Sequence, residues 1–244
     1  MARRRFFVPS ENIRSGSALL PPEQAHHLRD VLRLDGDDEV ELIDDAGAAY
    51  AGRVELHQNA VLVIGLRVIA SNEPVSAKLV LAPALIRSEK FAWMLQKATE
   101  LGVNEIVPLV TLRCEVRLAA EKLEGRVERW QRIVREAAKQ SRLLSIPSVR
   151  LPMSFSEFVA PKDDSASCDR LLFYEDCSDP WDATCLRGSQ TVLCVGPEGG
   201  WDASEIEMAL RSGFTIFGLG PRILRAETAS LVAVTLIQFA KRRH

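Results

Sequence analysis

Two glycine-rich segments in the C-terminal half of the chain are the clearest candidates for chemistry. Residues 196–200 read Gly-Pro-Glu-Gly-Gly, and residues 218–222 read Gly-Leu-Gly-Pro-Arg. Each follows a short apolar segment and precedes a helical pattern, and glycine there lets the backbone approach a ligand closely. Ligands of open α/β sheets lie at the carboxyl ends of the strands. The two segments therefore predict one ligand site, with a pair of tight structural turns as the alternative.

The spacing of these glycines matches neither of the common phosphate-binding motifs. Gly218 and Gly220 are followed by Ile223, where a dinucleotide motif needs a third glycine. Residues 196–201 end on Trp201 and lack the Gly-Lys-Ser/Thr ending of a P-loop. A dinucleotide oxidoreductase and a P-loop enzyme are both disfavoured.

The residues around these segments alternate between strand and helix patterns. We predict strands and helices at 78–84, 90–101, 105–110, 125–144, 170–174, 192–195, 202–211, 214–217 and 227–241. Asp202 followed by Glu205 is typical of a capping box, and Gly213 of a helix end. Such alternation predicts an α/β fold with a mostly parallel sheet that helices cover on both faces.

The first part of the chain has a different pattern. Short strands are predicted at 5–9, 38–44, 50–56 and 61–68, with a helical stretch at 25–32. Tight turns between short strands are typical of a small barrel. The polar residues that precede Pro74 mark the boundary. We therefore expect domains at 1–72 and 75–244.

Composition limits the class of protein. The apolar fraction of 47% is sufficient for a full core, but no apolar run is long enough to span a membrane, and no secretory signal follows the basic start. Five cysteines without a C-x-x-C spacing argue against a disulfide framework and a structural zinc site. A cytoplasmic protein without metal is expected. The net charge of −2 means that any nucleic acid must bind to a local basic patch.

The combined motifs resemble a known family. Residues 195–201, 205–206 and 219–229 are similar to the C-terminal signature of the ribosomal RNA small-subunit methyltransferase E family, of the SPOUT class. Further similarity covers 4–7, 27–33, 96–103 and 130–147, so it extends over nearly the whole chain. One departure is Arg142, which follows Gln140 and Ser141 where many members have a small residue.

The resemblance implies a fold and an activity. The fold would be a C-terminal SPOUT domain, a parallel-sheet methyltransferase with a trefoil knot, behind an N-terminal PUA-like β-barrel that binds RNA. The activity would be the S-adenosylmethionine-dependent methylation of N3 of a specific uridine in 16S ribosomal RNA, within the small ribosomal subunit. The class works as a homodimer with its sites near the subunit interface, and the methyl donor itself needs no metal.

The resemblance also implies roles for residues of the two glycine-rich segments. Arg225 is the candidate that stabilises the anionic uracil. Glu198 and Glu227 are candidate proton acceptors, although either could instead cap a helix or hold Arg225. The cofactor would be bound by Leu172, Glu175, Val195, Gly196, Pro197, Gly199, Leu219, Gly220 and Leu224.

Basic and aromatic residues are candidates for contact with RNA. Phosphate contact is assigned to Arg3, Arg4, Arg5, Arg29 and Arg33, with a solvated basic surface as the equal alternative. Trp93, Trp130 and Trp201 are candidates to stack on a base, although helical spacing favours the core for Trp130. His26 and His27 are expected in turns or packing, since no ligand partner has metal spacing.

Two other functions stay open at this point. A SPOUT enzyme that methylates a ribose 2′-hydroxyl of rRNA or tRNA would share the fold and the cofactor. A non-catalytic RNA-binding or ribosome-assembly protein would share the fold alone. The identity of the methylated nucleoside distinguishes a ribose methyltransferase from an N3 methyltransferase. Cofactor binding distinguishes either enzyme from a non-catalytic protein.

Overall fold

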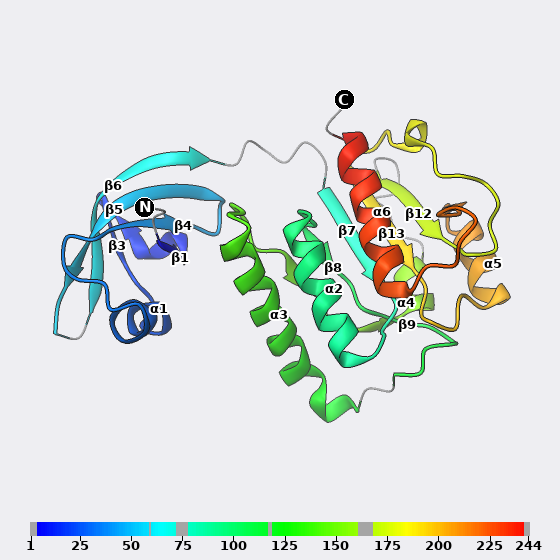
Figure 1. The fold of residues 1–244 in the computed structure, drawn as a ribbon, viewed down its shortest axis with the longest axis horizontal. Coiled ribbons are helices and arrows are strands. Elements are labelled where there is room, and N and C mark those ends of the chain that lie inside the picture. Colours follow the sequence, from blue (N-terminus) through cyan, green and yellow to red (C-terminus); the bar gives the residue numbers. More distant parts are fainter. Residues whose placement is uncertain (1–3, 59, 72–77, 117–118, 161–167, 242–244) are drawn as a thin grey trace. The chain divides into compact units, whose positions relative to one another are not determined.

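A computed structural model describes residues 4–58, 60–71, 78–116, 119–160 and 168–241 (Figure 1). The chain forms two compact units. One contains residues 1–75 and 138–146, and the other contains residues 76–137 and 147–244. The proposed boundary at residues 72–74 lies outside the described residues.

The N-terminal unit is built on a six-stranded sheet of order β1-β4-β5-β6-β3-β2. Its strands are β1 (Arg4–Phe7), β2 (Ile13–Arg14), β3 (Ser17–Leu19), β4 (Glu39–Ile43), β5 (Ala48–Leu56) and β6 (Val61–Ser71). β1 pairs in parallel with β4, and the other pairs are antiparallel. The four predicted strands are confirmed, and the β2–β3 hairpin was not predicted. Closure of this sheet into a barrel stays a prediction.

Apolar and acidic residues alternate along β4, and this alternation determines which of its side chains enter the core of the unit. Val40 and Leu42 are fully buried, whereas the intervening acidic residues are not. Val40 and Leu42 pack in one cluster with Phe6 and Leu28. The predicted helical stretch at 25–32 is confirmed, but it is divided into α1 (Pro22–His26) and a π-helical turn, η2 (His27–Val31).

The C-terminal unit has a fully parallel six-stranded sheet of order β10-β8-β7-β13-β12-β14, as predicted. Its strands are β7 (Lys78–Pro83), β8 (Glu105–Ile106), β10 (Ser148–Val149), β12 (Cys168–Phe173), β13 (Gln190–Val195) and β14 (Thr215–Phe217). A separate pair is formed by β9 (Leu109–Val110) and β11 (Met153–Ser154). Except for the short β10 and β11, these strands follow the predicted sequence pattern.

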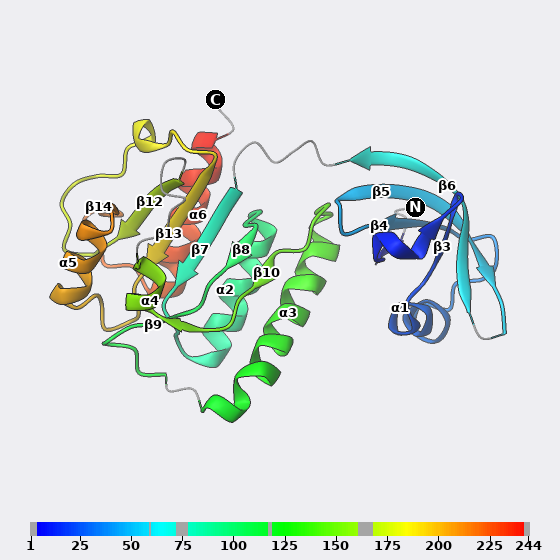
Figure 2. The ribbon, with the colours of Figure 1, turned by 180° about the vertical axis from the view of Figure 1, so that it is seen from behind.

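Helices cover both faces of this sheet (Figures 1 and 2). They are α2 (Ser88–Glu100), α3 (Leu123–Gln140), α4 (Phe155–Val159), α5 (Ala203–Arg211) and α6 (Ala226–Lys241). Short 3₁₀ turns occur at Ala120–Lys122 and Ala183–Cys185 in this unit, and at Ser10–Asn12 in the N-terminal unit. In Figure 1, α6 and α2 lie in front of the central strands, and in the opposite view they lie behind them. Within the described residues, no helix has the length and apolarity that a membrane crossing requires.

Each face of the sheet has its own apolar packing. Phe91, Met94, Leu95 and Ala98 form the buried stripe of α2, at the helical spacing that the sequence predicts. Phe91 packs on Trp130 of α3 with ring centroids 4.7 Å apart, so Trp130 is a core residue. The opposite face is packed by the helices α4 and α5.

Two predicted elements differ from the structure. The strand expected at 105–110 is broken into β8 and β9, because Pro108 lacks the N–H that a continuous ladder requires. The helix expected to reach residue 144 ends at Gln140, and Arg142 follows with φ of +55°. That conformation favours glycine, and it lies where relatives were expected to have a small residue.

Candidate functional site

Three strands end at the same edge of the parallel sheet. In the register of the sheet, Phe173 at the end of β12 pairs with Val195 of β13 and with Phe217 of β14. The three loops that follow these strands therefore begin side by side. Two of them are the glycine-rich segments, and the third begins at Tyr174.

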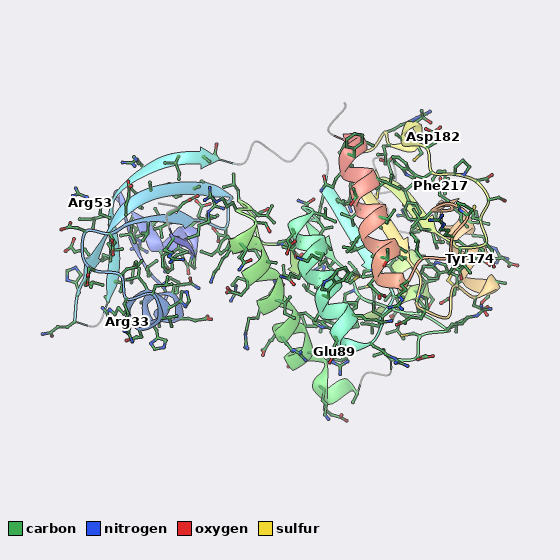
Figure 3. All side chains as sticks on the ribbon, viewed as in Figure 1. Arg33, Arg53, Glu89, Tyr174, Asp182 and Phe217 are labelled. Atoms are coloured by element: carbon green, nitrogen blue, oxygen red, sulfur yellow. The ribbon has the colours of Figure 1, made fainter. Side chains whose placement is uncertain are left out.

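These loops enclose a cavity of about 240 Å³. Nine of the residues predicted for the site line it. They are Glu175, Val195, Gly196, Pro197, Leu219, Gly220 and Leu224 from the predicted cofactor set, together with the catalytic candidates Glu198 and Arg225. Leu172, Gly199 and Glu227 do not line it. Figure 3 labels Tyr174 and Phe217, which mark the ends of β12 and β14 beside the cavity.

Trp201 is a buried support for the first glycine-rich loop. Its side chain is 1% exposed and packs on Phe155, with ring centroids 4.8 Å apart. Its indole N–H donates a hydrogen bond of 3.0 Å to the carbonyl oxygen of Phe173. A Cβ at Gly196 would lie 3.0 Å from the same indole nitrogen, so a larger residue would be crowded there. Trp201 thus belongs to the core, and the hypothesis that it stacks on a base is wrong.

Gly200 and Glu175 meet on one wall of the cavity. Gly200 has φ of +71°, and a Cβ on it would overlap the carboxylate of Glu175. Glycine is therefore needed both for the left-handed backbone and for the close approach of the carboxylate. This contact joins the loop after β12 to the loop after β13.

Arg225 lies where the second glycine-rich loop enters α6. Its carbonyl oxygen accepts the hydrogen bond of the Ala229 N–H, the first turn of the helix. Its side chain is exposed on the cavity wall, and within the described residues no ion pair involves it. The guanidinium is consequently available to a ligand in the cavity.

Glu198 in the loop after β13 and Glu227 in the first turn of α6 approach the same cation. The Nζ atom of Lys90 lies 3.5 Å from Glu198 Oε1 and 3.8 Å from Glu227 Oε1. The side chain of Glu198 is 32% exposed, whereas that of Glu227 is 10% exposed. Glu227 Oε2 is buried and has no hydrogen-bond partner within the described residues. The two carboxylates therefore have different environments.

Tyr174 also lines the cavity, but its hydroxyl already has a partner. The hydroxyl donates a hydrogen bond of 2.9 Å to Asp176 Oδ2. This hydrogen bond, partial burial and the charges of Asp176 and Glu175 raise the pKa of the Tyr174 phenol. The phenol is protonated at neutral pH and is not a proton acceptor.

Leu172 and Gly199 lie outside the cavity. Leu172 is fully buried in the core below the sheet edge, where it pairs with Cys194. Gly199 faces the segment after β9, and its carbonyl oxygen accepts a hydrogen bond of 3.4 Å from Arg113. Arg113 also lies 3.4 Å from Asp202, the N-cap of α5, whose capping box with Glu205 is confirmed.

The basic residues predicted to contact RNA fall into two groups. Arg5 pairs with Glu41, and Arg29 donates to the carbonyl oxygens of His57 and Ala60, so protein atoms occupy both guanidiniums. Arg4 and Arg33 are exposed (Figure 3 labels Arg33). Arg3 lies outside the described residues.

Several lining residues were not predicted from the sequence. They are Phe173, Tyr174, Gly200, Arg222, Ile223, Ala226 and Ala229. Most are neighbours of predicted residues, so the loop assignment could have included them. Lys90 is different, because only the packing of α2 against α6 brings it to the loops.

A parallel sheet whose strand-end loops enclose a cavity defines an α/β domain built to bind a ligand at that edge. Comparison with known families names the class more closely. A model described as an RNA methyltransferase domain matches residues 72–238, and a model described as an RNA methyltransferase PUA domain matches residues 20–63.

Individual relatives agree with this class. The ribosomal RNA small subunit methyltransferase E of Synechocystis is 35% identical over 239 residues, covering 96% of this chain and 76% of the relative. The same-named protein of Neisseria gonorrhoeae, solved bound to S-adenosyl methionine, has a TM-score of 0.85 at 31% identity and 98% coverage of both chains. A Legionella pneumophila protein solved with the same cofactor has a TM-score of 0.86 at 29% identity, again covering 98% of both chains. This chain belongs to the ribosomal RNA small subunit methyltransferase E family.

Proposed function

We propose that this protein transfers a methyl group from S-adenosylmethionine to N3 of a uridine in 16S ribosomal RNA. Family membership supports the cofactor and the methylation of ribosomal RNA. The choice of N3 is supported by one observation, namely that Arg225 and the carboxylate of Glu198 lie on the wall of the same cavity. Uridine N3 carries a proton, so its methylation requires both a proton acceptor and stabilisation of the anionic base.

The residues of the cavity fit the cofactor. Leu219 and Leu224 supply apolar surface for an adenine ring, and the glycine-rich backbone supplies hydrogen-bonding groups without side chains in the way. The carboxylate of Glu175 lies beside them and suits a positively charged amino group. When bound, the cofactor supplies a methyl group already activated on a sulfonium sulfur.

The residues of the chain then have distinct tasks. The Glu198 carboxylate accepts the N3 proton, and the Arg225 guanidinium stabilises the negative charge that develops on a uracil oxygen. The backbone of the two glycine-rich loops orients both reactants, because methyl transfer from a sulfonium depends mainly on alignment.

The domains, the oligomeric state and the form of the RNA substrate are proposed from the family. Residues 1–72 form a PUA-like β-barrel that binds RNA, with Arg4 and Arg33 as its exposed candidate cations. Residues 75–244 form a SPOUT domain with a trefoil knot. The protein works in the cytoplasm as a homodimer, on RNA within the small ribosomal subunit. The match of a PUA model to residues 20–63 supports the first of these assignments.

The test is to incubate the purified protein with methyl-labelled S-adenosylmethionine and unmethylated small ribosomal subunits, with naked 16S rRNA as a comparison. Mass spectrometry of the nucleosides should find N3-methyluridine. A ribose-methylated nucleoside would instead assign the activity to a 2′-hydroxyl enzyme. No label together with no cofactor binding would leave only an RNA-binding protein.

A further inference from the structure

We infer that Lys90 is a positioning residue that holds the Glu198 carboxylate at the cavity through their ion pair, and that Glu198 rather than Glu227 accepts the proton. This inference rests on the proposed function and concerns the same site. It is drawn from the geometry of three side chains that come from three separate elements, α2, the loop after β13 and α6.

The first step concerns which carboxylate can reach a substrate. Glu198 lines the cavity and its side chain is 32% exposed. Glu227 does not line the cavity and its side chain is 10% exposed. A proton acceptor must come within hydrogen-bond reach of the proton that it abstracts. Because Glu198 lies on the cavity wall and Glu227 does not, Glu198 is the better candidate.

The second step concerns the cost of a buried carboxylate. Glu227 Oε2 is buried without a hydrogen-bond partner within the described residues, although Oε1 lies 3.8 Å from Lys90. A buried charge of this kind persists only when an opposite charge compensates for it. The Lys90 ammonium supplies this opposite charge for Glu227, and the same ammonium lies 3.5 Å from Glu198.

Several other titratable and charged groups lie near Glu198. The segment after β9 contributes the half-buried Cys114; burial, followed by smaller effects that include the charge of Glu198, raises the pKa of its thiol. Glu115 of this segment pairs with Arg87 at 3.8 Å. Glu175, Arg222 and Arg225 line the cavity with Glu198. Lys90 is the cation within ion-pair distance of Glu198 among the described residues.

The proposed proton step uses groups of this site. The N3–H bond of uridine breaks, the proton goes to a Glu198 carboxylate oxygen, and the electron pair stays on N3. That pair would form the new bond to the methyl carbon while the carbon–sulfur bond of the sulfonium donor breaks and leaves its electron pair on sulfur. The carboxylic acid then releases its proton to solvent through its exposed side.

The experiment compares four variants in single-turnover methylation across pH. In Lys90→Met, turnover at neutral pH should fall about tenfold or more, and the acidic limb of the pH–rate profile should move to higher pH. In Glu227→Gln the acidic limb should move to lower pH, because Glu227 no longer competes with Glu198 for the positive charge of Lys90. Lys90→Arg should retain most of the turnover.

Lys97→Met is the matched control. Lys97 lies on the same helix with the same exposed fraction of 35%, but pairs with Glu100. Its substitution should change neither turnover nor the profile. Equal profiles for Lys90→Met and wild type, or shifts of the same sign in Lys90→Met and Glu227→Gln, would overturn the inference.

A second measurement separates this inference from the proposed function. The titration of the Glu198 carboxyl can be followed by carbon-13 NMR without RNA, with Glu198→Gln to assign the signal. It should move to higher pH in Lys90→Met and stay unchanged in Lys97→Met. If wild-type protein methylates a position other than N3, the proposed function fails while this titration still tests Lys90. If the titration does not move, the role of Lys90 fails even if N3-methyluridine is made.

Discussion

The indole N–H of Trp201 donates a hydrogen bond of 3.0 Å to the carbonyl oxygen of Phe173. This bond joins the end of β12 to the loop after β13, and both segments line the candidate site. The bond is buried, because Trp201 is 1% and Phe173 is 4% exposed. The shape of the cavity therefore depends on a residue that does not itself line it.

Trp201→Phe should weaken both the fold and the site. The substitution leaves a buried carbonyl without its partner, which costs about 1–3 kcal/mol of unfolding free energy. Cofactor affinity should fall as well, because the two loops lose a shared support. Urea denaturation and calorimetry measure the two effects. Trp93→Phe is the control, since Trp93 is 46% exposed. Equal unfolding free energies for the two variants would contradict this account.

Gly200→Ala should reduce cofactor affinity by about tenfold, equivalent to ~1.4 kcal/mol. The new methyl group would displace the carboxylate of Glu175 from the cavity wall. Gly213→Ala is a matched control, because Gly213 has φ of +77° and nothing within 4 Å of its Cβ position. Both variants carry a left-handed backbone cost of roughly 1–2 kcal/mol. Thermal melts with and without cofactor should show that only Gly200→Ala loses ligand-induced stabilisation.

Arg225→Ala should decrease turnover by about 10²–10³-fold, the usual effect of removing a group that stabilises developing charge. Cofactor affinity should stay within a few-fold of wild type, as calorimetry can measure. Arg211→Ala serves for comparison, since that exposed arginine pairs with Glu207 on α5. Lost cofactor binding in folded Arg225→Ala protein would reassign the residue to the cofactor.

Glu105 should make the stability of the C-terminal unit depend on pH. Burial tends to raise the pKa of its carboxyl, but ion pairs with Lys78 and Arg150 outweigh burial, so the pKa is lowered. A carboxyl whose pKa is lowered in the folded state stabilises the fold at pH values above the ordinary pKa of glutamate. This stabilisation is lost as the pH falls through the pKa of the folded state.

Glu105→Gln should therefore lower the unfolding free energy by roughly 1 kcal/mol near pH 7, since both partners are largely exposed. The difference from wild type should shrink below about pH 4.3. Denaturation at several pH values tests this, with Glu207→Gln, in an exposed pair, as the control. A difference that stays constant down to pH 2 would disagree with the ion-pair account.

The sequence by itself determined the elements and most of the site. Apolar periodicity placed β7, β12, β13 and the helices α2, α3, α5 and α6, because burial of alternate or every third and fourth residue depends only on local order. The capping box of α5 was predicted because its two members are three residues apart. The glycine-rich segments were recognisable for the same reason, and they contain seven of the sixteen residues that line the cavity.

Tertiary structure decided which separate segments meet. The register of β12 with β13 and β14 brings the loop that starts at Tyr174 to the glycine-rich loops, and no local pattern encodes that register. Trp201 was a candidate to stack on a base, yet it is a buried support. Lys90 lies in a helical pattern far from either loop in sequence. Its ammonium reaches Glu198 and Glu227 because α2 packs against α6, and charge interactions depend on distance in space.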